Sequence, residues 1–221
     1  MVSTAPRIVV LISGEGSNLQ AIIDATNARR IAGTVALVVS NRSAARGLER
    51  ARAAGIPAKY LGVQPGADRA AYDAALAELL AEHHPDVLVL AGFMRILGAE
   101  LVARFAGRTL NIHPSLLPKY PGLDTHRRVL EAGDREHGAT VHLVTNDLDM
   151  GPRVIQYRLA VRPDDTPESL QQRVHVGEHL ILPRAVDWLA TGRLKLGAGG
   201  IMLDSMALSE PITVEEENGS Q

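Results

Sequence analysis

The fold class is decided by the stretch Arg7-Ile-Val-Val-Leu-Ile-Ser-Gly-Glu-Gly-Ser-Asn18, near the start of this 221-residue chain. Its apolar run predicts a strand over residues 7–13, and its glycines predict a tight turn before a helix over about 17–30. Further apolar runs alternate with helical patterns, as they do in βαβ units. The sequence therefore predicts a single-domain, Rossmann-like α/β fold whose mixed, mostly parallel, twisted sheet has helices on both faces.

The pattern changes in the second half of the chain. The strand at residues 108–113 is ended by Pro114, and the runs at 138–145 and 154–161 predict strands that pair antiparallel. A long helix is expected to start at Thr166-Pro167, a good N-cap and first-turn pair. We expect residues 1–196 to form one domain. Residues 197–221 form a Gly-rich and acidic tail that we expect to be mobile and not catalytic.

Composition excludes several classes of function. The chain has no cysteine, which rules out disulfides, a thiolate nucleophile and cysteine-bound zinc. It has 23 lysines and arginines against 25 acidic residues and no long basic run, so we expect no nucleic-acid partner. The longest apolar stretch, residues 87–94, is too short to span a bilayer. Residues 1–6 leave no room for a signal peptide, so a cytoplasmic location is predicted.

The glycine turn after the first strand is a candidate anion site. Backbone N–H groups and the dipole of the following helix favour an anion there. Leu19 replaces the third glycine of G-x-G-x-x-G, and Arg42 follows the second strand where an NAD ribose would need an acidic residue. A compact phosphate monoester therefore fits better than a dinucleotide, although the 2′-phosphate of NADP stays an alternative for Arg42.

The phosphate would be held by Gly16, Ser17 and Asn18, the last two through their side chains as well. Glu15 is expected to point away from a dianion. The alternative is that Ser17 and Gln20 only form a capping box for the helix.

The strand that ends at Pro114 carries the candidate catalytic pair. Asn111 and His113 share one face of it, roughly 7 Å apart, near the carboxyl end where α/β sheets bind ligands. An amide donor beside a protonated imidazole suits acyl transfer, because both can stabilise a developing oxyanion and the imidazole can give a proton. Asp147 and Asp149 lie in a later loop. A carboxylate near His113 would favour its protonated form, although both residues are also common in turns.

Three longer segments carry a family resemblance: Ile12-Ser-Gly-Glu-Gly-Ser-Asn-Leu19, Ala91-Gly-Phe-Met-Arg-Ile-Leu97 and Leu110-Asn-Ile-His-Pro-Ser-Leu-Leu-Pro-Lys-Tyr-Pro-Gly122. They closely resemble the phosphoribosylglycinamide formyltransferases, the folate-dependent enzymes of purine synthesis. Shorter matches continue in order to Glu178-His179, so that the likeness covers roughly residues 7–196. The chain departs from some relatives at Asp124 and His175, where they carry His and Gln.

The resemblance implies the formyltransferase fold and transfer of formyl from 10-formyltetrahydrofolate, as co-substrate, to the amine of glycinamide ribonucleotide through a tetrahedral intermediate. Asn111 would bind the formyl oxygen, His113 would be the general acid, and Asp149 would keep His113 protonated, directly or through water. No metal is implied. The N-terminal half would bind the substrate phosphate through Gly16, Ser17 and Asn18, with Glu178 at the ribose or amine end. The C-terminal half would face the folate. The folate contacts would come from both halves: Arg69 (at the acidic tail), Met94, Arg95, Ile96 and Leu97 from the first, and Val144 and Asp147 from the second.

Some features of the sequence also occur in proteins with other functions. Methionyl-tRNA formyltransferase and formyltetrahydrofolate hydrolase share this core, but each is expected to carry a further domain. His175-Val-Gly-Glu-His179 spells the H-x-x-E-H motif of a class of zinc peptidases, without a convincing third ligand. A nicotinamide-dependent oxidoreductase or a non-catalytic binding module is also conceivable for such a fold. An exposed sheet edge would make a homodimer plausible.

Overall fold

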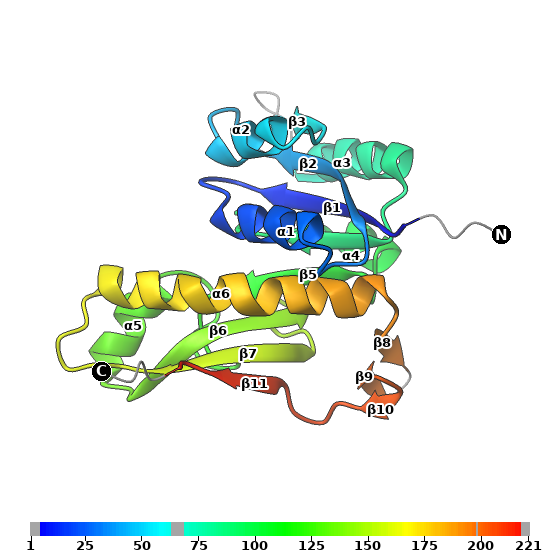
Figure 1. Cartoon of the computed structure of the whole chain (residues 1–221). Helices are drawn as coiled ribbons and strands as arrows, with labels where there is room; N and C mark the ends of the chain where they lie inside the picture. The colour runs from blue at the N-terminus through cyan, green and yellow to red at the C-terminus, as the bar shows by residue number, and fades with distance from the viewer. Residues whose placement is uncertain (1–4, 63–68, 198, 218–221) are drawn as a thin grey trace.

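The computed structural model describes residues 5–62, 69–197 and 199–217. Within these residues the main sheet runs in the order β11-β7-β6-β5-β4-β1-β2-β3, and β8, β9 and β10 form a small second sheet (Figure 1). The strands of the main sheet are β1 Arg7–Ile12, β2 Thr34–Ser40, β3 Ala58–Tyr60, β4 Val87–Leu90, β5 Thr109–His113, β6 Glu136–Leu143, β7 Arg153–Ala160 and β11 Ile212–Glu215. The small sheet has β8 Leu194–Gly197, β9 Gly200–Leu203 and β10 Met206–Ala207. The helices are α1 Ser17–Asn27, α2 Arg46–Ala53, α3 Arg69–His83, α4 Ala99–Arg104, α5 Thr125–Ala132 and α6 Pro167–Ala190.

Strand directions confirm the predicted mixed sheet. β5, β4, β1, β2 and β3 are parallel, and their carboxyl ends therefore lie along one edge. β6 is antiparallel to both β5 and β7, as the pattern of the second half predicts. β11 then adds to β7 in parallel. The candidate pair on β5 thus lies where the parallel half of the sheet meets the antiparallel half.

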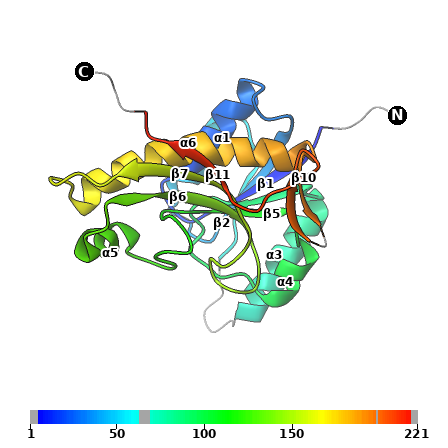
Figure 2. The same ribbon diagram turned by 90° about the horizontal axis from the view of Figure 1, so that it is seen from below.

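Each face of the sheet has its own apolar core. In β1, Ile8, Val10 and Ile12 pack into one core with α1, α2 and α6, whereas Val9 and Leu11 pack into the other with α3 and α4. This alternation follows from the two-residue period of a strand. Figure 2 shows α1 and α6 on one side of the sheet and α3 and α4 on the other. The prediction of helices on both faces is confirmed.

Helix α6 packs against the sheet closely at Gly177. It begins as predicted at Thr166, which forms a capping box with Ser169, and Pro167 is its first residue. At Gly177 an added Cβ would lie 1.9 Å from the Tyr157 ring, so no larger residue fits there without movement of the ring. This glycine, which would weaken an isolated helix, instead lets the neighbouring Glu178 reach the interior.

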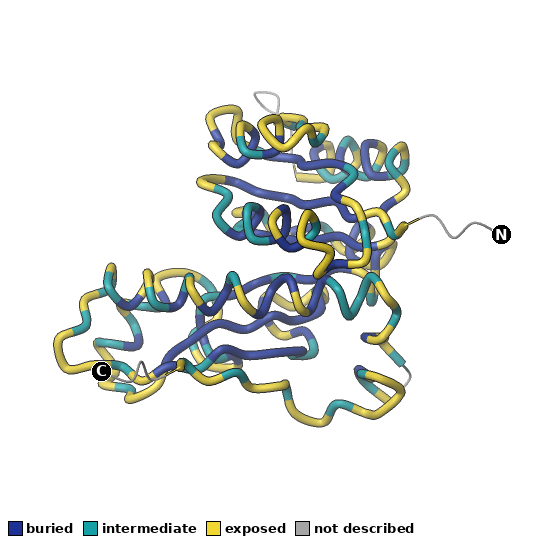
Figure 3. The backbone as a smooth tube through the Cα atoms, viewed as in Figure 1, coloured by how far each residue is buried: buried dark blue, intermediate teal, exposed yellow. Residues whose placement is uncertain are grey.

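The tail after Leu196 is the main correction to the sequence prediction. Residues 197–221 were expected to be a mobile tail, but the described part contains β9, β10 and β11. β11 pairs with β7 from Ile212 to Glu215, and Arg173 holds the next residue, Glu216, through ion pairs of 2.6 Å. Much of this segment stays exposed (Figure 3), which explains why its sequence has no strong apolar pattern. Residues 218–221 lie outside the described residues.

Three short elements that begin in the main domain were not predicted. β3 has three residues, α5 follows the proline-rich loop at residues 114–122, and β8 begins at Leu194. Most other boundaries differ from the prediction by one to three residues. The helical pattern over about residues 68–84 predicts a helix that begins at Asp68, which lies outside the described residues. None of the described helices is both long and apolar enough to cross a membrane.

Candidate active site

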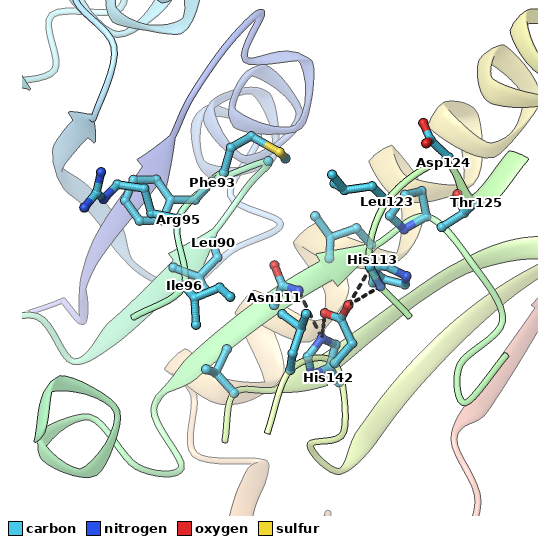
Figure 4. A pocket seen from close by; sticks show the side chains of 18 of the residues that line it. Leu90, Phe93, Arg95, Ile96, Asn111, His113, Leu123, Asp124, Thr125 and His142 are labelled. Carbon is cyan, nitrogen blue, oxygen red and sulfur yellow. Dashed lines mark hydrogen bonds and ion pairs between the residues drawn. The ribbon is translucent and has the colours of Figure 1, made fainter. Parts of the chain in front are cut away.

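A cavity of about 910 Å³ lies beside the carboxyl ends of β4 and β5. Its walls come from the segment after β4, from the loop at residues 144–149 between β6 and β7, and from the segment that leads into α5. Figure 4 shows Ile96 and Leu90 on one side of this space and Leu123 and Thr125 on the other. The lining is largely apolar with a few converging polar groups, the usual character of a small-molecule site.

Asn111 and His113 both line this cavity, as their spacing predicts. Leu110 and Ile112 point the opposite way, into the core beneath α1 and α6. His113 is buried and Asn111 is half-buried. The period of the strand has therefore placed an amide and an imidazole side by side at the mouth of an apolar pocket.

Both ring nitrogens of His113 face oxygen atoms. Nε2 lies 2.8 Å from the Tyr120 carbonyl oxygen and Nδ1 lies 3.4 Å from Asp149 Oδ2. The same Oδ2 accepts a hydrogen bond of 2.9 Å from the Gly122 N–H. Because a carbonyl and a carboxylate only accept, the doubly protonated imidazolium is the form of His113 that satisfies both contacts. At 3.4 Å no water fits between Nδ1 and Asp149, so the contact is direct.

His142 completes the polar cluster and was not predicted as a site residue. It stands opposite Asn111 in the β5–β6 register, and its Nε2 lies 3.0 Å from Asn111 Nδ2 (Figure 4). Burial lowers the pKa of His142, which keeps it neutral. Its Nδ1–H then donates to the Leu143 carbonyl, 3.0 Å away, and Nε2 accepts from Asn111. The cross-strand register was the signal that could have identified His142.

The predicted folate contacts mostly gather around the same cavity. Residues that line it are Met94, Arg95, Ile96, Leu97, Val144 and Asp147. The Arg95 guanidinium stacks 4.2 Å from the centre of the Tyr72 ring. Arg69 is the exception, because it lines a separate cavity of about 500 Å³ between α3 and α4. There it donates a hydrogen bond to the Leu97 carbonyl and lies 3.6 Å from Asp73.

The glycine turn has the geometry of an anion site more than that of a side-chain cap. Gly16 is the N-cap of α1, with φ of 75°, and no side-chain capping bond is present, which disagrees with the capping-box alternative for Ser17. An added Cβ on Gly16 would lie 2.6 Å from Gly47, so a glycine is required on both counts. Glu15 is paired with Arg46 and Arg50 at 3.1 and 2.7 Å, and so points toward α2.

Asn18 and Glu178 join this turn to helix α6. Asn18 Nδ2 donates to Glu178 Oε2 over 2.7 Å, in a contact that is buried on both sides. Burial raises the pKa of Glu178, and the hydrogen bond from Asn18 partly offsets that effect. Asn18 Oδ1 is buried and has no partner among the described residues. Gly16, Ser17, Asn18 and Glu178 do not line the cavity that holds His113.

The H-x-x-E-H segment does not resemble a zinc site in the described part of the chain. His175 and His179 lie with ring centres 6.3 Å apart, and His175 Nε2 is 3.9 Å from Glu178 Oε2. Across the described residues, no group of three or more His, Cys, Asp or Glu side chains is placed to hold a metal ion.

Comparison with known proteins identifies the family. The family model described as formyl transferase matches residues 6–186. This chain belongs to the formyl transferase family. It is 53% identical to the phosphoribosylglycinamide formyltransferase of Escherichia coli (strain K12) over 202 residues, which cover 91% of this chain and 95% of that protein.

Solved structures agree with that relationship. The phosphoribosylglycinamide formyltransferase of Coxiella burnetii superposes with a TM-score of 0.89 at 46% identity, covering 94% of this chain and 99% of that one. A formyltetrahydrofolate deformylase from Pseudomonas syringae pv. tomato str. DC3000 superposes with a TM-score of 0.83 at 27% identity, covering 91% of this chain and 66% of its own. The resemblance carried by the three quoted segments is confirmed, and so is the fold class.

Proposed function

We propose that this chain is a phosphoribosylglycinamide formyltransferase, in which His113 is the general acid. It transfers the formyl group of 10-formyltetrahydrofolate to the amine of glycinamide ribonucleotide in de novo purine synthesis. The observation that carries the mechanism is the cluster of Asn111, His113 and Asp149 at one end of an apolar cavity. High identity to a protein of that name over nearly the whole chain supports the substrates.

The reaction begins when the neutral amine of the ribonucleotide attacks the formyl carbon. The new N–C bond forms as the formyl C=O becomes a single bond, which leaves a tetrahedral oxyanion. Asn111 Nδ2 carries two hydrogens, and since His142 Nε2 accepts one of them, the other can be donated to this oxyanion. His142 thereby fixes the amide group with its N–H side available.

Collapse of the intermediate breaks the bond between the formyl carbon and N10 of the folate. N10 then needs a proton. The attacking nitrogen must lose one, to water or to the His113 ring once that ring has given up its own proton. An imidazolium at His113 can steady the oxyanion and supply the proton, and the Asp149 carboxylate favours that charged form by direct contact. In this structure Nε2 of His113 donates its proton to the Tyr120 carbonyl oxygen. The substrate must replace that carbonyl as the acceptor before His113 can transfer the Nε2 proton to N10.

Substrate binding divides between the two regions. Met94, Ile96, Leu97 and Val144 supply apolar surface for the pterin, and Asp147 an acceptor for its ring N–H groups. Arg95 and Arg69 are the candidates to bind the acidic end of the folate. Arg69 would bind it from the neighbouring cavity, where its guanidinium donates to the Leu97 carbonyl. The ribonucleotide phosphate would be held at Gly16, Ser17 and Asn18, with Glu178 at its ribose or amine end.

Deformylase activity is the second candidate, because the fold is shared with a formyltetrahydrofolate deformylase. The test is to follow release of tetrahydrofolate from 10-formyltetrahydrofolate with and without glycinamide ribonucleotide, and to identify the second product by mass. We expect release only with the ribonucleotide, together with one formylated ribonucleotide per tetrahydrofolate. Release at the same rate without the ribonucleotide, with formate as product, would establish hydrolysis instead.

A homodimer remains a further proposal. The edges of the main sheet in the described residues are β11 and the three-residue β3, so a dimer formed by strand pairing would have to use one of them. Analytical ultracentrifugation checks this, with a sedimentation coefficient that rises with concentration as the expected result.

A further inference from the structure

A second pair of histidines adjoins the same cavity without a role in the reaction above. His126 on α5 lines the cavity, and its Nδ1 lies 2.9 Å from Nε2 of His137 on β6. The two rings meet edge to face, with centres 5.1 Å apart. His137 is 1% exposed, and its Nδ1 is buried without a partner among the described residues. Nothing proposed for formyl transfer accounts for this pair.

The unpaired nitrogen of His137 fixes which atoms carry protons. A neutral imidazole has one N–H donor and one bare acceptor nitrogen. Among buried backbone groups, an N–H without a partner is rarer than a carbonyl without one, and we apply the same preference to the ring. We therefore assign Nδ1 of His137 as the bare nitrogen, with its Nε2–H donating to Nδ1 of His126. That hydrogen bond requires Nδ1 of His126 to be an acceptor, so the proton of His126 lies on Nε2.

Nε2 of His126 is free to meet a ligand. It has no hydrogen-bond partner in the described part of the chain, and it is not among the buried unpaired atoms there. Since the residue lines the cavity, this nitrogen is the polar atom that His126 offers to it.

The surroundings keep both rings uncharged. Burial, together with the nearby His175 and His113, lowers the pKa of His126 to about 4. Burial also lowers the pKa of His137 to about 3, with Asp134 as the nearby group that acts in the opposite direction. A neutral His126 suits its position, because a second imidazolium beside His113 would oppose the protonation that the reaction uses.

We propose that His126 is a substrate-positioning residue. Its Nε2–H donates to the carbonyl oxygen of the glycinamide group, beside the attacking amine of the ribonucleotide. His137 holds His126 in the tautomer that carries the proton on Nε2. The inference rests on the proposed function. A neutral N–H donor such as that of His126 suits an uncharged carbonyl oxygen of the ribonucleotide. The phosphate of the ribonucleotide is instead bound more strongly by several backbone N–H groups at a helix N-terminus. Only a CH₂ group separates that carbonyl from the amine, so holding the oxygen also directs the nucleophile toward the formyl carbon.

Kinetics of four variants test the positioning role. His126→Phe removes the donor but keeps a ring, and we expect kcat/KM for the ribonucleotide to fall about tenfold, the scale of one hydrogen bond. His137→Phe should cause a smaller fall, because His126 then samples both tautomers. His137→Asn, whose amide can still donate, should restore most of the loss. KM for the folate should stay unchanged in all three variants. His84→Asn is the matched control, because His84 is exposed and lies far from both His126 and His137 in the sequence.

Nitrogen-15 NMR of histidine-labelled protein tests the tautomer without any substrate. At pH 7 we expect the pattern of a neutral ring protonated at Nε2 for His126, and a mixture of both tautomers in His137→Phe. A His126 ring protonated at Nδ1 would overturn the proposal, and so would unchanged ribonucleotide kinetics in His126→Phe. If the wild-type protein did not formylate the ribonucleotide, the proposed function would fail, while the NMR result would still report on the pair itself.

Discussion

Two pairs of imidazoles adjoin one cavity, and their surroundings differ. His113 and His142 lie at 3.4 and 3.7 Å from the two oxygens of Asp149, whereas His126 and His137 bond to each other at 2.9 Å. All four rings are wholly or largely enclosed. In the first pair the carboxylate contacts both rings. The nearest partners of His113 are two oxygens, the Tyr120 carbonyl and Asp149 Oδ2, whereas the nearest partner of His142 Nε2 is the Asn111 amide nitrogen at 3.0 Å.

The partners of these rings suit one residue type to three protonation states within one site. A ring between two oxygen acceptors is suited to carry a positive charge, as His113 is. A ring that must accept from an amide, as His142 does from Asn111, stays neutral with its proton on Nδ1. A ring that accepts from another imidazole, the role that we assign to His126, is neutral with its proton on Nε2. Partners, and not burial alone, decide which histidine can act as an acid.

The largest expected effect comes from removing the charged ring. His113→Ala should lower kcat by about a hundredfold or more, the usual scale for a positioned general acid. His126→Phe should act mainly on binding and orientation of the ribonucleotide instead. Steady-state kinetics with both substrates varied would separate the two. Equal losses of kcat in both variants would remove the distinction between the pairs.

Removing the carboxylate should weaken His113 without replacing it. In Asp149→Asn the ring loses the carboxylate oxygen that lies 3.4 Å from Nδ1, so the charged form of His113 loses its anionic partner. Because the reaction uses that form, kcat should fall, by less than in His113→Ala. Steady-state kinetics measure this, and an unchanged kcat would mean that Asp149 serves only the loop and its bond to Gly122.

A smaller loss is expected when His142 no longer holds Asn111. His142→Phe removes the acceptor for Asn111 Nδ2, and a misdirected amide should lower kcat by about tenfold, comparable to one hydrogen bond. His142→Gln, whose side-chain oxygen can accept, is the matched control and should keep more of the activity. If both variants behaved alike, the hydrogen bond between the strands would not be what positions Asn111.

The smallest effect concerns stability in acid. His126 and His137 have folded pKa values of about 4 and about 3, below the ordinary value of 6.5. Their neutral forms therefore stabilise the fold fully above pH 6.5, and this stabilisation is lost as pH falls toward the folded pKa, by at most about 1.4 kcal/mol per pH unit for each group. His137→Asn cannot titrate, so its free energy of unfolding should fall less steeply between pH 6.5 and pH 4.5. Urea unfolding at several pH values measures the slope, and parallel lines for the two proteins would contradict the neutral pair.

The sequence could predict the parts of the site that depend on local period. Asn111 and His113 share a face because strands alternate, and the neighbouring Ile112 belongs to the opposite core. The glycine turn was also readable, since Gly16 needs its positive φ before α1. The approach of Asp149 to His113 followed only from the family resemblance, because no local pattern joins residues 36 positions apart.

Other parts depend on contacts that no single segment encodes. His142 was missed because its role needs the register between β5 and β6, and His126 was missed because α5 itself was not predicted. Arg69 was assigned to the folate, although its side chain lies in the neighbouring cavity. β11 was missed because half-exposed strands at a sheet edge have weak apolar patterns, and ion pairs such as Arg173–Glu216 are invisible until the chain is folded.

The most direct measurement is the protonation of the four rings in histidine-labelled protein at pH 7, observed by nitrogen-15 NMR. Both nitrogens of His113 should show the shifts of an imidazolium, and Asp149→Asn should remove them, while His126, His137 and His142 should show one protonated and one bare nitrogen each. A neutral His113 beside the intact Asp149, or an imidazolium within the His126–His137 pair, would contradict the assignment of His113 as the acid.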